Sequence, residues 1–130
     1  MVRTILVFFD GSAEARKAFD LTIEIAEKFQ AKVLIIGVTS EVKAEAMLDR
    51  GQNYFGDEFL QLCDEAKQKG ISCQYRFDVG DSIKQILLAA EDHNANLIII
   101  GRAPATEKRT LVGSQVQGLI RHASCPVTVV

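Results

Sequence analysis

Glycine and serine residues near the C-terminal end of the chain have the pattern of a phosphate-binding turn. A short apolar run is followed by one glycine, a polar loop, and a Gly-Ser pair that begins a helical pattern. The first turn of a helix has N–H groups without intrahelical partners and carries the positive end of the helix dipole, so it attracts anions. The pattern predicts a phosphate site formed by Gly101, Arg102, Gly113, Ser114 and Gln115.

Pro104 lies inside this loop and argues against a tight phosphate grip. Proline has no N–H to donate, and its φ is fixed at a negative value. The loop also has three basic side chains against one acidic side chain. Arg102 or Arg109 is therefore a candidate to replace the lost backbone donors by pairing with phosphate oxygens. The alternative is a solvated loop without a ligand.

A second polar group, Asp10-Gly11-Ser12, follows the first apolar run of the chain. The Asp10 carboxylate is able to accept hydrogen bonds from a nucleotide base or ribose, or to hold a magnesium ion through water. Asp-Gly-Ser is also favourable turn chemistry, so a purely structural role is the alternative. Ser12 is predicted to be the N-cap of the next helix, whether or not a ligand binds.

Strand-like and helix-like patterns alternate along the whole chain. Such alternation is typical of a parallel sheet with crossover helices on both faces, and it predicts an α/β fold with five strands and four helices. The strands are expected at residues 4–9, 33–38, 73–77, 97–100 and 127–130, and the helices at about 15–26, 44–69, 83–90 and 112–120.

The third strand indicates the order of the sheet. Apolar and polar residues alternate in it, which is typical of a half-exposed edge strand. Because crossover connections are right-handed, an edge position for this strand favours the order 3-2-1-4-5 in a doubly wound sheet. Strands one and four are then neighbours, and the loops that begin at Asp10 and at Gly101 are expected to meet at the crevice where such sheets bind ligands.

The composition predicts one domain, residues 1–130. A net charge of -2 gives no strong field to attract nucleic acid or a membrane surface. No apolar run approaches the roughly 20 residues that span a bilayer, and no signal peptide is recognisable, so a cytoplasmic location is expected. The three cysteines show no CxxC spacing and are expected to be buried, apolar and without metal. A redox role would require Cys63 or Cys73 to be exposed.

The sequence resembles the universal stress protein family over nearly its whole length. No single motif is specific enough to show this resemblance, but the order and spacing of several short segments are. The matching segments are residues 5–12 (ILVFFDGS), 80–83 (GDSI), 97–101 (LIIIG), 113–114 (GS) and 125–130 (CPVTVV).

The resemblance implies a small cytosolic stress-response protein with the adenine nucleotide alpha hydrolase-like fold. It further implies a homodimer paired through the last strand, Val127 to Val130, and an ATP or AMP site, with magnesium, in some members. By the same resemblance Val38 would lie against adenine, and Ile100 would flank the base.

Nucleotide-binding members of the family look like Gly, two residues, Gly, nine residues, then Gly with Ser or Thr. Here Gly101 and Gly113-Ser114 match, but Pro104 occupies the middle position and only eight residues separate it from Gly113. We expect ATP or AMP binding with a variant phosphate loop. The alternative is a stress-response dimer that does not bind ATP and acts through protein contacts.

Catalytic motifs are scarce. The sequence contains no HExxH, GxSxG or GxxxxGK[ST], and neither His93 nor His122 has a nucleophile beside it. We expect at most slow hydrolysis of bound ATP. A strand at the edge of the sheet has free N–H and C=O groups, so pairing of the last strand with a second copy is the expected contact.

Overall fold

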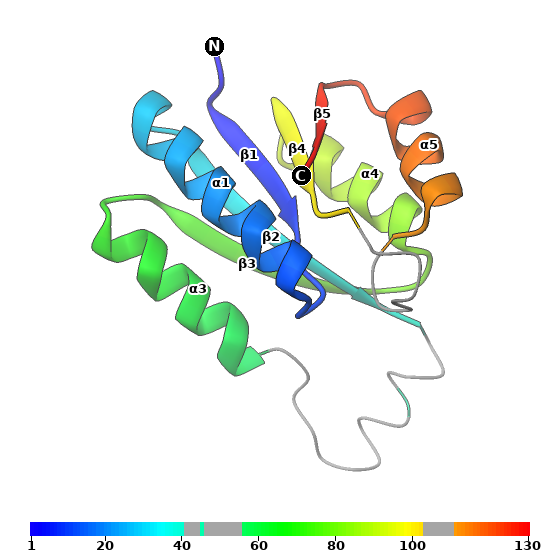
Figure 1. Ribbon diagram of the computed structural model, residues 1–130, viewed down its shortest axis with the longest axis horizontal. Coiled ribbons are helices and arrows are strands. Elements are labelled where there is room, and N and C mark those ends of the chain that lie inside the picture. Colours follow the sequence, from blue (N-terminus) through cyan, green and yellow to red (C-terminus); the bar gives the residue numbers. More distant parts are fainter. Residues whose placement is uncertain (41–44, 46–55, 103–110) are drawn as a thin grey trace.

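The computed structural model describes residues 1–40, 45, 56–102 and 111–130, and in it five parallel strands form one sheet (Figure 1). Its order is β3-β2-β1-β4-β5, which confirms the predicted order and the edge position of the third strand. The strands are β1 (Thr4–Phe8), β2 (Lys32–Thr39), β3 (Cys73–Val79), β4 (Leu97–Ile100) and β5 (Val127–Val129).

The helices that the structure describes in full are α1 (Ala13–Phe29), α3 (Gly56–Gln68), α4 (Ser82–Asp92) and α5 (Gly113–His122). Each corresponds to one of the four predicted helices. The helix predicted from residue 44 to residue 69 is described from Gly56 to Gln68, and most of its first part lies outside the described residues.

Two apolar clusters cover the two faces of the sheet. Successive side chains of a strand point to opposite faces, and β1 contributes Ile5 and Val7 to one cluster and Leu6 and Phe8 to the other. Helices α1 and α3 pack on the first cluster, and α4 and α5 on the second (Figure 1). A strand covered on both faces has to be apolar at every position, which explains the uninterrupted first run of the sequence.

The ends of the strands differ slightly from the prediction. Strand β1 ends at Phe8, although Phe9 still donates its N–H to the Ile36 carbonyl (2.9 Å). Strand β5 ends at Val129, but the N–H of Val130 continues the ladder to the Ile100 carbonyl (2.9 Å). Both residues therefore extend the backbone pairing towards the end of the sheet where the candidate site lies.

Candidate functional site

The candidate site lies at the C-terminal ends of β1 and β4, the two central strands between which the chain reverses its direction of winding (Figure 1). Helix α1 follows β1 on one face of the sheet, whereas α5 follows β4 on the other. Asp10 and Gly101 line the same small cavity there. The predicted meeting of the two loops is thus confirmed for the residues that the structure describes.

The turn from β1 into α1 is closed by its own hydrogen bonds. The Ser12 Oγ accepts from the N–H of Ala15 (3.1 Å), and Asp10 Oδ1 accepts from the N–H of Ser12 (3.0 Å). Gly11 has a φ of +85°, which glycine adopts without strain. The prediction that Ser12 is the N-cap of this helix is confirmed.

Asp10 has a second carboxylate oxygen with a different environment. The residue is only 9% exposed, and Oδ2 is buried without a hydrogen-bond partner among the described residues. The Oε2 atom of Glu14, one turn along the chain, is in the same situation. Buried polar atoms are normally hydrogen-bonded because desolvation alone is unfavourable. Both oxygens are thus ready to accept hydrogen bonds from a ligand or to take part in cation binding.

A glycine is required at position 101 because the backbone of α1 packs closely against it. A Cβ atom at this position would lie 2.6 Å from both the carbonyl carbon and the carbonyl oxygen of Glu14. The next residue, Arg102, donates its N–H to the Val130 carbonyl (2.9 Å), so that N–H is already used, while its side chain is exposed. Gly101 therefore allows a close approach, and the group that approaches it is the backbone of α1.

The first turn of α5 is not capped by a side chain in the way that Ser12 caps α1. Its N-cap is Val112, whose side chain makes no capping hydrogen bond, although Gln115 Oε1 accepts from the N–H of Val112 (2.9 Å). The N–H of Val116 donates to the Val112 carbonyl (3.0 Å). The N–H groups of Gly113, Ser114 and Gln115 belong to the first turn, which has no helical acceptors to offer them.

Gly113 has no packing reason to be glycine. A Cβ atom built there has no neighbour within 4 Å, and the residue does not have a positive φ. Gly113 and Ser114 are both exposed, while the Gln115 side chain is half-buried. These residues leave the positive end of the α5 dipole accessible from solvent, which is the arrangement that binds anions.

The cavity between these two helix starts is small. It has a volume of about 10 Å³ and is lined by Phe8, Asp10, Ala15, Gly101 and Leu111. This is about the space of one water molecule. Leu111 is 5% exposed and packs in the cluster beneath α4 and α5, so it forms one wall of the cavity. An adenine ring does not fit within these five residues as they stand.

The other predicted site residues are placed as follows. Val38 is half-buried near the end of β2, at the periphery of the cluster that Leu111 joins, and Ile100 is completely buried in that cluster. Their contacts with a base stay predictions. Residues 103–110, which include Pro104 and Arg109, lie outside the described residues.

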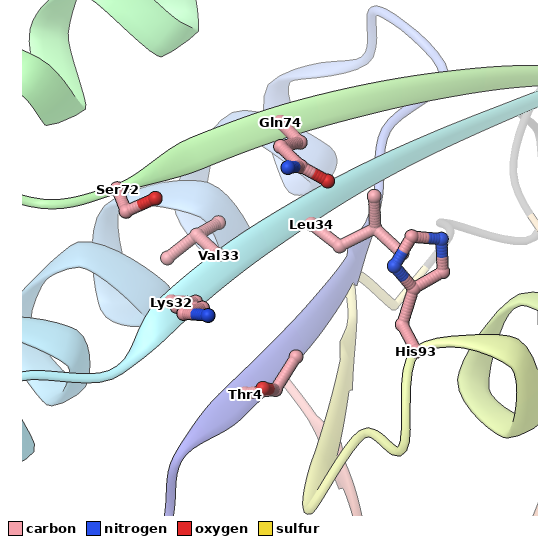
Figure 2. A pocket seen from close by; sticks show the side chains of 7 residues that line it. All are labelled: Thr4, Lys32, Val33, Leu34, Ser72, Gln74 and His93. Atoms are coloured by element: carbon pink, nitrogen blue, oxygen red, sulfur yellow. The ribbon is translucent and has the colours of Figure 1, made fainter.

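A larger pocket, of about 220 Å³, lies at the opposite end of the strands (Figure 2). Thr4, Lys32 and Ser72 come from or next to the first residues of three strands, and His93 approaches from the end of α4. Open α/β sheets bind ligands at the carboxyl ends of their strands. The smaller cavity beside Asp10 is therefore the candidate site in spite of its size.

Glu14 and Leu111 were not predicted as site residues. The signal for Leu111 was an apolar side chain between a polar loop and a helix. The role of Glu14 has no signal in the sequence, because it depends on the distance between α1 and β4. Within the described ranges no three His, Cys, Asp or Glu side chains gather as a metal site. No described helix has both the length and the apolar character needed to cross a membrane.

Comparison with known proteins places the chain in a family. The model of the universal stress protein family matches residues 1–130. A putative universal stress protein of Staphylococcus aureus is 31% identical over 139 aligned positions, which cover 98% of this chain and 83% of that protein.

Solved structures of the family share the fold. A universal stress protein in complex with cAMP has a TM-score of 0.77 and 23% identity, covering 99% of this chain and 97% of that one. A family member from Arabidopsis thaliana with AMP bound has a TM-score of 0.73 and 16% identity, covering 98% and 90%. At these identities the likeness shows the fold alone. The match of the family model over the whole chain and the similarity to the Staphylococcus protein show that this chain belongs to the universal stress protein family.

Proposed function

We propose that this chain binds an adenine nucleotide, ATP or AMP, across the ends of β1 and β4. The observation that carries the proposal is the pairing of two features at one crevice: the buried, unpartnered Oδ2 of Asp10 and the uncapped first turn of α5. The Asp10 oxygen accepts hydrogen bonds, and the N–H groups of the first turn of α5 donate them. A nucleotide has N–H and O–H donors at its base and ribose and acceptor oxygens at its phosphates, so it complements both.

The phosphates are assigned to the first turn of α5. Backbone N–H groups and the Ser114 hydroxyl would donate to phosphate oxygens. Because Gly113 has no side chain, the phosphate oxygens could approach the backbone closely. The exposed guanidinium of Arg102 begins the same loop and is able to donate two parallel hydrogen bonds to a phosphate.

The base or ribose is assigned to the side of Asp10. Because Leu111 forms one wall of the small cavity beside Asp10, a base that reaches Oδ2 would have to displace this side chain. Leu111 lies near the end of the loop that joins β4 to α5, so its movement would couple nucleotide binding to the conformation of that loop. We propose this coupling as the signal that a protein partner reads.

Magnesium is proposed to accompany ATP. Mg²⁺ keeps several waters and is commonly held by phosphate oxygens together with one or two carboxylates. The unpartnered oxygens of Asp10 and Glu14 suit such a role, directly or through water.

Isothermal titration of nucleotide-free protein with ATP and AMP, with and without magnesium, tests the proposal. We expect micromolar binding, and we expect Ser114→Ala to weaken it about fivefold to tenfold, the value of one hydrogen bond. Ser72→Ala is the matched control, because Ser72 lines the pocket at the other end of the sheet. Absence of binding up to millimolar nucleotide, or equal losses in both variants, would contradict the proposal.

A second function is favoured by the small size of the cavity beside Asp10. With about 10 Å³ of space and a buried Leu111, the crevice as described suits a protein that uses no nucleotide and works as a stress-response dimer through protein contacts. Failure of every nucleotide to bind in the titration would select this function.

In either function we propose a homodimer formed through β5. Strand β5 is at the edge of the sheet, and the residues that flank it, Pro126 and Val130, make backbone hydrogen bonds with β4. Backbone groups alternate in direction along a strand, so the N–H and C=O of Val127 and Val129 point away from β4. A second copy related by a two-fold axis would pair with these groups.

Light scattering of the Val129→Pro variant tests the dimer. Proline removes an N–H on the free side of β5 and leaves the hydrogen bonds with β4 in place. We expect a dimer for the unmodified protein and a folded monomer for the variant. Ser72→Ala again serves as the control, and a monomer before substitution would contradict the proposal.

A further inference from the structure

Two cysteine side chains meet at the edge of the sheet that is remote from the nucleotide crevice. The Sγ atoms of Cys63 and Cys73 lie 3.2 Å apart. Cys63 is on α3, and Cys73 is the first residue of β3, so the contact joins a helix to the edge strand beneath it. Both cysteines are free thiols.

The surroundings of this pair allow a reagent to reach it. Both side chains are half-buried and lie at the periphery of the apolar cluster that α1 and α3 cover. The sequence predicts buried cysteines, and for Cys63 and Cys73 this prediction is wrong. Cys73 lies at the beginning of its strand, whereas the nucleotide crevice lies beyond the opposite ends of the strands. A change at the pair is thus distant from the proposed site.

We propose that Cys63 and Cys73 form a reversible disulfide and are an oxidation site of this protein. A disulfide bond is about 2.05 Å long, so the sulfur atoms must approach each other by about 1.2 Å. The Cys63 side chain on α3 and the first residue of an edge strand are both at the surface layer of the fold. Only a local adjustment is therefore needed, and no element has to leave the sheet.

The oxidant is a low-molecular-weight disulfide such as oxidised glutathione. The Cys63 thiolate attacks one of its sulfur atoms, which breaks that S–S bond, releases one glutathione thiolate and leaves a mixed disulfide on Cys63. The Cys73 thiolate then attacks the Cys63 sulfur and displaces the second glutathione. Two protein thiols are oxidised, one external disulfide is reduced, and the two protons leave with the two glutathione thiols.

Burial governs the rate of this exchange. It raises the pKa of both thiols, and for Cys63 a hydrogen bond with Cys73 acts against this effect. A raised pKa leaves little thiolate at neutral pH, so the exchange is slow there and faster in mildly alkaline buffer. Burial and the neighbouring Cys63 both raise the pKa of Cys73, whereas the hydrogen bond with Cys73 lowers that of Cys63, so Cys63 is the first nucleophile.

The experiment counts thiols in the complete, reduced protein after incubation with oxidised glutathione at about pH 8.5. Remaining thiols are alkylated in denaturant and counted by intact mass. We expect three alkylations before oxidation and one afterwards, on Cys125. Trypsin cleaves after Lys67 and Lys69, so a disulfide-linked pair of peptides should appear without reductant and disappear with it.

Three serine variants make the result specific. Cys125→Ser should still lose two thiols, whereas Cys63→Ser and Cys73→Ser should form only mixed disulfides with glutathione. The crosslink closes a short loop and should raise the Tm by about 5 °C or more. Retention of all three thiols, stable glutathione adducts on the unmodified protein, or a crosslink that includes Cys125 would overturn the proposal.

Discussion

Helices α1 and α5 both begin at the crevice between β1 and β4, but they treat their first-turn N–H groups differently. In α1 the Ser12 hydroxyl caps the helix and Asp10 holds the turn that leads into it. In α5 the cap is Val112, which has no polar group to offer. One helix start is satisfied by its own sequence, and the other leaves its donors for something else.

The glycines beside these helix starts show the same contrast. Gly101 is fixed by the backbone of α1, which would collide with any side chain, whereas Gly113 faces open space. A glycine in such an open position costs a little stability, because glycine has more conformational freedom to lose on folding than other residues. The two glycines at this crevice therefore differ in their surroundings: Gly101 is packed against α1, whereas Gly113 is open, as the proposed phosphate site requires.

Substitution of the two glycines by alanine should produce the largest effect. Gly101→Ala forces β4 and α1 apart and should lower the free energy of unfolding by about 1–3 kcal/mol. Gly113→Ala should change it by less than about 0.5 kcal/mol while weakening ATP binding. Urea unfolding of both variants measures the difference, and equal destabilisation would remove the contrast.

Asp10→Asn should have the next largest effect, and this effect should be on ATP binding, not on stability. The amide oxygen still accepts from Ser12, but an N–H₂ donor replaces the unpartnered Oδ2, so ATP binding should weaken about tenfold or more. Asp81→Asn is the matched control, because Asp81 caps α4 by accepting from the Lys84 N–H (2.9 Å) and does not line the cavity beside Asp10. A tenfold loss in the control, or none in Asp10→Asn, would show that Oδ2 does not contact the nucleotide.

The two helix starts also differ in the roles of their serines. Ser12→Ala removes an N-cap and should cost about 1 kcal/mol of stability. Ser114→Ala removes an exposed hydroxyl and should change stability by less than about 0.5 kcal/mol. Thermal unfolding checks both values, and a destabilised Ser114→Ala would indicate that Ser114 has a structural role after all.

The sequence was sufficient for the fold because the apolar runs, the alternation in β3 and the rule for crossover handedness all agree. It was also sufficient for Ser12, since Asp-Gly-Ser before a helical pattern is a local signal. It did not separate the roles of Gly101 and Gly113, which depend on how closely α1 approaches β4. Nor did it reveal the contact of Cys63 with Cys73, because the fold of the intervening turn creates that distance.

An ion pair at the beginning of α1 supplies the smallest and last test. Arg16 makes a two-pronged hydrogen bond with Glu65 of α3, and its Nε lies 3.2 Å from Asp20. Among the described residues no ion pair joins α5 to a neighbouring element. The Arg16 hydrogen bond lowers the pKa of Glu65, so the pair stabilises the fold above the pKa of glutamate in the unfolded chain.

This stabilisation should be lost as the pH falls through the lowered pKa of Glu65. Because both side chains are 44% exposed, the effect should be small. The measurement is the difference in unfolding free energy between the unmodified protein and Glu65→Gln, at neutral pH and at steps below about pH 4.5. We expect this difference to shrink towards zero in acid. A difference that stays constant with pH would mean that Glu65 contributes by packing, and that the start of α1 is held by its cap and its glycine contact alone.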